Sequence, residues 1–167
     1  MTCLKKYFYH SHLFFNPMLT ITLKSLFRRD LEKLKQEVSL YKNEKNLWIV
    51  DKNIANSAGN LCLHLIGNLS HFIGAQLGNS GYIRNREAEF SLKNVPKQEL
   101  LEKIDQTITA VEQGLAKVTE LQLAEEYPIL VFAEKTSIEY FLVHLAMHLN
   151  YHLGQINYHR RLLDLED

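Results

Sequence analysis

The stretch HLAMHLNYHLGQINYH, residues 144–159, indicates a helical fold because its histidines recur at the spacing of an α-helix. His144, His148, His152 and His159 follow one another at intervals of four, four and seven residues. In a helix with 3.6 residues per turn, such residues share a stripe roughly 80° wide. Half of the chain's eight histidines are therefore expected on one face of one helix.

Apolar residues run along the edge of this stripe, so the histidines border the core side of the helix. Leu145, Leu149, Ile156 and Leu163 have the period of an amphipathic helix. Imidazole rings beside an apolar stripe need partners for their ring nitrogens. The pattern thus predicts a long helix with a polar seam, from about residue 136 to residue 163.

The rest of the chain shows the same periodicity and little else. Apolar residues recur at helical spacing in three further segments, at about residues 19–41, 57–76 and 96–121. The short apolar run ILVF, residues 129–132, has no partner strand and is interpreted as an irregular crossover. The sequence therefore predicts an all-α fold, a four-helix bundle with a long loop, residues 78–95, between its second and third helices.

Composition narrows the class of protein. The 167 residues fit a single domain at residues 18–167, preceded by an N-terminal extension at residues 1–17 that an upstream start would explain. Nineteen basic and nineteen acidic residues leave no electrostatic footprint for nucleic acid. No run approaches the roughly 20 apolar residues that a membrane helix needs. Two widely spaced cysteines favour a reducing compartment, and we expect a cytoplasmic protein.

Two histidines four residues apart on a helix can aim their ring nitrogens at one metal ion. His148 and His152 form such a pair, and so do His144 and His148. A third ligand has to come from another helix, where the predicted second helix offers His64 and His71. A polar stripe on one helix would then face a polar stripe on the other.

The same residues are also compatible with an alternative, a buried row of polar side chains that binds no metal. In it, the imidazoles would form hydrogen bonds with Asn60, Asn68 and Gln155. Two metalloenzyme classes are disfavoured: a zincin needs glutamate where Leu149 stands, and a di-iron bundle needs acidic ligands that the fourth helix lacks.

Three segments together resemble the DinB superfamily, which includes the YfiT-like metal-dependent proteins. They are CLHLIGNLSHFIGAQLG (62–78), SGYIRNREAEF (80–90) and HLNYHLGQI (148–156), and the resemblance covers about residues 19–163. It implies a four-helix bundle that holds a divalent metal, often nickel or zinc, with three histidines. Carried over to this chain, the ligands are His64, His148 and His152, with His71 as the alternative to His64.

The resemblance also implies an activity. Some members of the superfamily are thiol S-transferases that use a low-molecular-weight thiol, so we expect a small-molecule thiol or electrophile as partner. Three neutral imidazoles leave a divalent metal with open positions, where a bound thiol would lose its proton near neutral pH. A metal-dependent hydrolase and a non-catalytic metal-binding bundle are the alternatives. A homodimer is a further expectation from the family.

Metal-bound imidazoles usually donate their other N–H group to a neighbouring acceptor. Asn68 and Gln155 are candidates for this role, and His144 is expected at the rim of the site or beside its ligands. Arg84 and Arg86 lie in the long loop and would suit a carboxylate group on a thiol cofactor or substrate. Pairing of these arginines with the glutamates of the same segment is the alternative.

Overall fold

The structure is a computed structural model that describes residues 18–51 and 53–165. Within these ranges the chain is helical and contains no strand; one isolated bridge joins Glu126 to Ser137. The predicted extension at residues 1–17 lies outside the described residues. The α-helices are α1 (Met18–Ser39), α2 (Ala58–Leu69), α3 (Arg86–Ser91), α4 (Lys97–Ala116), α5 (Glu120–Leu123) and α6 (Ile138–Leu163). A 3₁₀ helix, η1 (Glu44–Trp48), precedes α2, and a π-helix, η2 (Ser70–Ala75), extends it.

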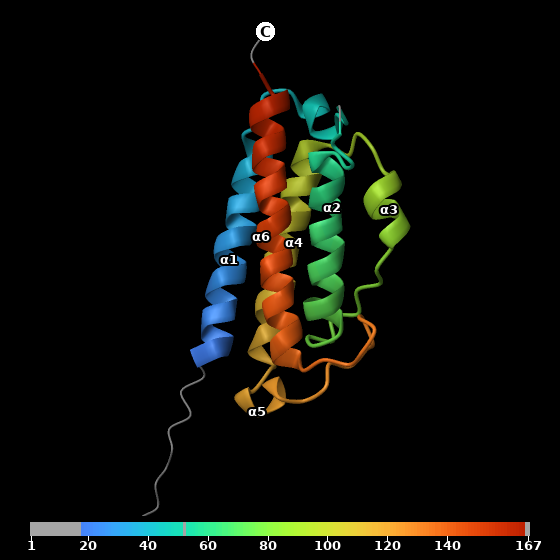
Figure 1. Cartoon of the computed structure of the whole chain (residues 1–167). Coiled ribbons are helices and arrows are strands. Elements are labelled where there is room, and N and C mark those ends of the chain that lie inside the picture. Colours follow the sequence, from blue (N-terminus) through green and yellow to red (C-terminus); the bar gives the residue numbers. More distant parts are fainter. Residues whose placement is uncertain (1–17, 52, 166–167) are drawn as a thin grey trace, which may run out of the picture.

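The four long helices, α1, α2, α4 and α6, lie side by side (Figure 1). Arg28 of α1 contacts Glu112 near the end of α4. Lys35, further along α1, contacts Asp105 nearer the start of α4, so these two helices are antiparallel. Helices α2 and α6 also pack against each other and run in opposite directions (Figure 1). The start of α2 and the end of α6 therefore lie at the same end of the molecule.

The second helix is enclosed by its neighbours. All of its residues are buried, and it packs against α3, α4, α6 and η1. Ser57 begins the helix by accepting a hydrogen bond from the backbone N–H of Asn60. Its burial places the polar side chains His64 and Asn68 inside the protein, where each needs a partner.

The predicted third helix at residues 96–121 is wrong in its extent. Helix α4 ends at Ala116, and α5 begins after Thr119. The Thr119 side chain accepts the backbone N–H of Gln122, whose own side chain accepts the Thr119 N–H. This capping box starts a new helix and explains the break.

The long connection between α2 and α4 also contains α3, which the sequence did not predict. Asn85 caps this helix by accepting the backbone N–H of Ala88. Helix α3 packs on α2 at Gly67, where a Cβ atom would lie 2.8 Å from the Cδ atom of Glu89. Glycine thus allows the Glu89 carboxylate to approach the backbone of α2.

None of the helices described is long and apolar enough to cross a membrane.

Candidate metal centre

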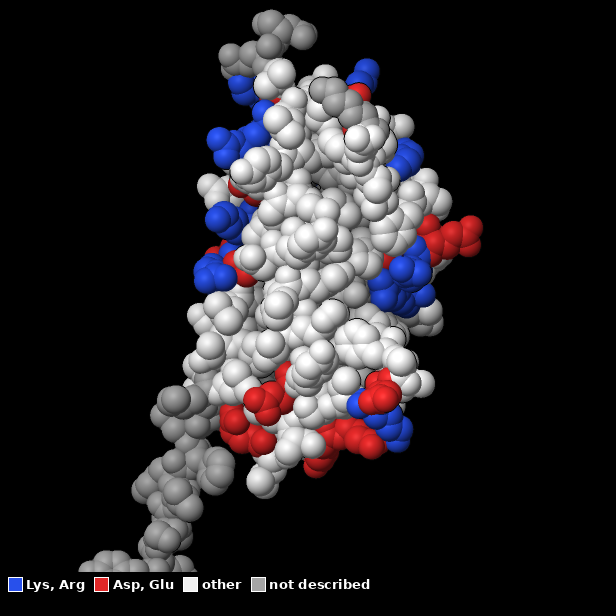
Figure 2. All heavy atoms as spheres, in the orientation of Figure 1, with Lys and Arg blue, Asp and Glu red and all other residues white. Residues whose placement is uncertain are grey.

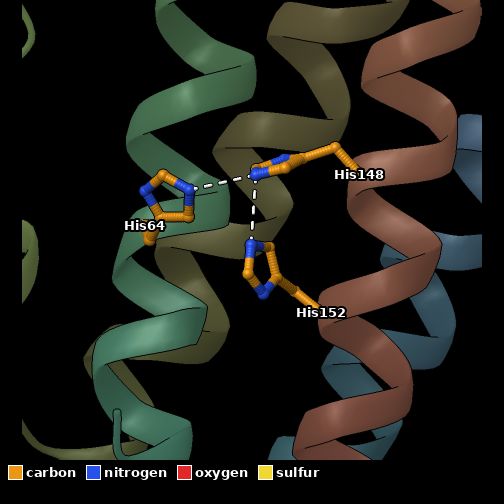
Figure 3. Close-up of side chains that lie close together, drawn as sticks. All are labelled: His64, His148 and His152. Atoms are coloured by element: carbon orange, nitrogen blue, oxygen red, sulfur yellow. Dashed lines mark hydrogen bonds between the residues drawn. The ribbon is translucent and has the colours of Figure 1, made fainter. Parts of the chain in front are cut away.

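Three histidines from two helices meet between α2 and α6 (Figure 3). His64 comes from α2, and His148 and His152 come from successive turns of α6. The Nε2 atom of His148 lies 3.2 Å from Nε2 of His64 and 3.1 Å from Nε2 of His152. One ligand nitrogen from each ring lies within 4.8 Å of those of the other two. His71 does not belong to this cluster, so the structure brings His64 to the pair on α6.

These separations suit a single transition-metal ion. Imidazole nitrogens bind zinc at about 2.0–2.1 Å, so two of them at a tetrahedral ion lie about 3.3 Å apart. The two Nε2 distances at His148 are close to this value. Both pairs of nitrogens that include His148 therefore already have about the separation that a shared ion requires.

A carboxylate fixes the proton of His64. Nδ1 of His64 lies 2.9 Å from Oε2 of Glu89, a carboxylate that can only accept while ionised, so the ring N–H is at Nδ1. Arg84 donates to the same carboxylate through Nε, at 2.6 Å from Oε1, and through Nη2, at 2.8 Å from Oε2. This fork orients Glu89. The Nε2 atom of His64 consequently presents a lone pair to the centre.

The side-chain amide of Gln155 fixes the position of the proton on His152. Nδ1 of His152 lies 2.6 Å from Oε1 of Gln155, and the amide nitrogen of Gln155 donates to the Tyr151 hydroxyl at 3.3 Å. The amide oxygen therefore faces the imidazole, which donates its N–H from Nδ1. The Nε2 atom of His152, like that of His64, presents a lone pair.

His148 lies between these two lone pairs and cannot satisfy both. A neutral imidazole carries one proton, which would reach only one neighbour if it were on Nε2. If the proton is on Nδ1, it has no acceptor, because this buried atom has no hydrogen-bond partner. In that state three lone pairs converge, an arrangement that a cation stabilises. The donor set therefore fits a divalent metal better than it fits a hydrogen-bonded seam.

Electrostatics keep two of the rings, those of His148 and His152, in the neutral form that binds metal. Burial, together with the neighbouring imidazoles, lowers the pKa of His148 to about 3. Burial also lowers the pKa of His152. Burial raises the pKa of Glu89, but the hydrogen bonds from Arg84 and His64 outweigh this effect and leave its pKa below the ordinary value. The centre thus combines two neutral imidazoles with an ionised carboxylate behind the third ligand.

The remaining predicted residues lie around the centre. Gln155 contacts a ligand directly, as described above. Asn68 is buried, and its Oδ1 atom has no hydrogen-bond partner. The ring of His144 stacks on Phe141, with centroids 5.9 Å apart, and lies 6.1 Å from the ring of His148.

The two predicted arginines have different surroundings. Arg84 pairs with Glu89, the alternative that the sequence left open, and its side chain is largely buried. Arg86 is exposed, with its guanidinium carbon 5.9 Å from the centre of the Phe90 ring. Sequence reasoning did not assign Glu89 to the site, although it lies in the segment SGYIRNREAEF that carries the family resemblance.

A family model described as "Protein of unknown function (DUF1572)" matches residues 19–167. The chain belongs to this family. His64, Glu89, His148 and His152 all lie within the matched residues. No curated protein matches the sequence.

Proposed function

We propose that this DUF1572 protein is a DinB-like four-helix-bundle metalloprotein in which His64, His148 and His152 hold one divalent ion, nickel or zinc. The observation that carries the proposal is the convergence of three Nε2 atoms whose neighbours set the proton positions. Glu89 and Gln155 hold two of the rings with their lone pairs inward. The third ring, His148, lies between them with its other nitrogen unpaired.

We further propose that the centre transfers a low-molecular-weight thiol to a small electrophile. When bound, a divalent ion with an open position lowers the pKa of a thiol, so that a thiolate is available near neutral pH. The sulfur electron pair forms a bond to an electrophilic carbon, the leaving group departs with the electrons of the broken bond, and the thiol proton passes to water.

The protein's own residues prepare this site for the reaction. Arg84 and Glu89 hold His64 in the ligand tautomer, and Gln155 does so for His152. Within the described part of the chain, Cys62 is not available as a nucleophile: it is buried, and burial raises the pKa of its thiol to about 12. In the proposed reaction, the sulfur nucleophile comes from a bound small molecule.

The metal is tested by elemental analysis of purified protein, followed by titration of the stripped protein with nickel and zinc. Wild-type protein should hold close to one equivalent, and His64→Ala and His148→Ala should lose it. The matched control is His71→Ala, because His71 is on the same helical segment as His64 but outside the cluster. Metal-free wild-type protein that resists loading would reject the centre.

The reaction is tested by the loss of 1-chloro-2,4-dinitrobenzene in the presence of bacillithiol, glutathione or coenzyme A. Metal-loaded wild-type protein should accelerate the reaction with at least one thiol, and His148→Ala should not. Stoichiometric metal without any acceleration would instead support the non-catalytic alternative.

A further inference from the structure

A pocket of about 360 Å³ opens beside the candidate metal centre, between the 53–56 loop and the end of α6. Leu61 of α2 lines it, three residues before His64, and Gln155 of α6 lines it, three residues after His152. Three residues of helix rise about 4.5 Å, so the pocket begins roughly one turn from the ligands on both helices. Because α2 and α6 are antiparallel, Leu61 and Gln155 are displaced from the ligands toward the same end of the molecule (Figure 1).

Gln155 connects the pocket to the centre. Its Oε1 atom lies 2.6 Å from Nδ1 of His152, while the same side chain is exposed and forms part of the pocket wall. A molecule in the pocket would thus contact the residue that orients a metal ligand. His159 also lines the pocket, but both of its ring nitrogens are engaged, with the Tyr41 hydroxyl and the Ile49 carbonyl.

The residues that line the pocket indicate which class of small molecule it would bind. None of the described residues that line the pocket is Asp, Glu, Lys or Arg. Its surface is mainly aliphatic, with side-chain amides and one phenol; these residues include Ile54, Leu61, Leu162, Asn53, Asn56 and Tyr158. The centre of the face drawn in Figure 2 is likewise largely free of charged side chains, which gather at its edges. Arg84, the guanidinium nearest the ligands, is paired with Glu89.

We infer that this pocket receives an uncharged, largely apolar small molecule, the electrophile that reacts at the centre. Its volume lies in the range of pockets that enclose small ligands, and a few amides among aliphatic walls suit a molecule with one or two polar atoms. The inference rests on the proposed function for its chemical outcome. The pocket itself does not depend on the metal.

Binding of the neutral fluorophore N-phenyl-1-naphthylamine to metal-free protein tests the pocket separately from the centre. Leu162→Glu places a charge in the pocket wall, and Ala55→Trp fills it from the loop. The matched control is Met147→Glu, because Met147 is also an exposed apolar residue of α6 but lines a different apolar groove, against α1. Both pocket variants should weaken binding at least tenfold, and the control should change it less than twofold.

Two outcomes would overturn the inference. One is fluorophore binding that Met147→Glu abolishes and the pocket variants leave intact, which would place the probe in the α1–α6 groove. The other is equally tight binding of the anionic analogue 8-anilinonaphthalene-1-sulfonate, which would reject an uncharged ligand class.

Nuclear magnetic resonance on cobalt-loaded and zinc-loaded protein tests whether the bound fluorophore lies close to the metal centre. Cobalt should broaden the resonances of the bound fluorophore, and zinc should not. Binding without broadening in protein shown to hold cobalt would separate the pocket from the centre. Failure to load metal would reject the proposed function while the fluorophore titration still tested the pocket.

Discussion

Nδ1 of His64 lies 2.9 Å from Oε2 of Glu89, a carboxylate carried by the short helix α3 and only 5% exposed. This contact determines which nitrogen of His64 faces the other two histidines. Helix α3 contributes no residue to the hydrophobic core, yet its carboxylate sets the orientation of a buried histidine. Carboxylates in this position also increase the basicity of a metal-bound imidazole.

Replacement of Glu89 should therefore weaken metal binding without removing a ligand. We expect Glu89→Gln to lower the affinity about 10- to 100-fold, the usual effect of losing such a partner. Competition titration with a chelator measures this change. Glu87→Gln is the control, because Glu87 is exposed on the same helix. Equal affinities for wild-type protein and Glu89→Gln would contradict the role given to this carboxylate.

Gly67 offers a way to displace Glu89 without altering it. A Cβ atom at this position would lie 2.8 Å from Cδ of Glu89 and even closer to Oε1, so Gly67→Ala should push the carboxylate away from His64. Metal affinity should fall toward that of Glu89→Gln. Gly154→Ala on α6 meets no atom within 4 Å and should leave affinity unchanged while stabilising the helix by about 0.5–1 kcal/mol. If both variants bind metal like the wild type, the close approach of α3 is unimportant.

The Arg84–Glu89 pair should contribute to stability as well as to metal binding. Its side chains are 13% and 5% exposed, and removal of one partner leaves a buried charge unpaired. We expect Arg84→Met to lower the free energy of unfolding by about 3 kcal/mol. Arg84→Lys should recover only part of it, because lysine cannot make the two-atom fork. Urea unfolding provides the measurement, with the exposed Arg86→Met as control; a loss below 1 kcal/mol would count against the pair.

The stability of metal-free protein should depend on pH through His159. Burial lowers the pKa of this histidine below 6.5, and a hydrogen bond to the Ile49 carbonyl only partly offsets that effect. The unfolded state then binds more protons between the folded pKa and 6.5, so stability is complete above pH 6.5 and is lost as the pH falls below it.

His159→Gln removes this titration and should make the loss of stability between pH 7 and pH 5 smaller than in the wild type. Urea unfolding in the presence of chelator at several pH values measures the difference. Parallel curves for the two proteins would show that His159 does not contribute.

The sequence predicted the fold well where local periodicity and burial coincide. The stripe on α6 and the apolar period of α1 both lie where the core requires them. The predicted third helix is too long because Val118 and Leu121 continue its apolar period past the break; Val118 packs against the core, but Leu121 is 80% exposed. The capping box at Thr119 is a local signal in the sequence and could have located the break.

The candidate site was predictable only in part, for a similar reason. His148 and His152 follow from spacing on one helix, and His64 followed from the family resemblance. Glu89 could not be placed, because its contact with His64 depends on how α3 packs against Gly67, a nonlocal relationship that periodicity does not describe.

A crystal structure of the protein loaded with nickel or zinc, with anomalous diffraction recorded at the metal edge, would show whether the three histidines share one ion. We expect a single anomalous peak about 2.0–2.2 Å from the Nε2 atoms of His64, His148 and His152. A peak that contacts only one of these rings, or a metal bound elsewhere with the three Nε2 atoms still in mutual contact, would contradict this expectation.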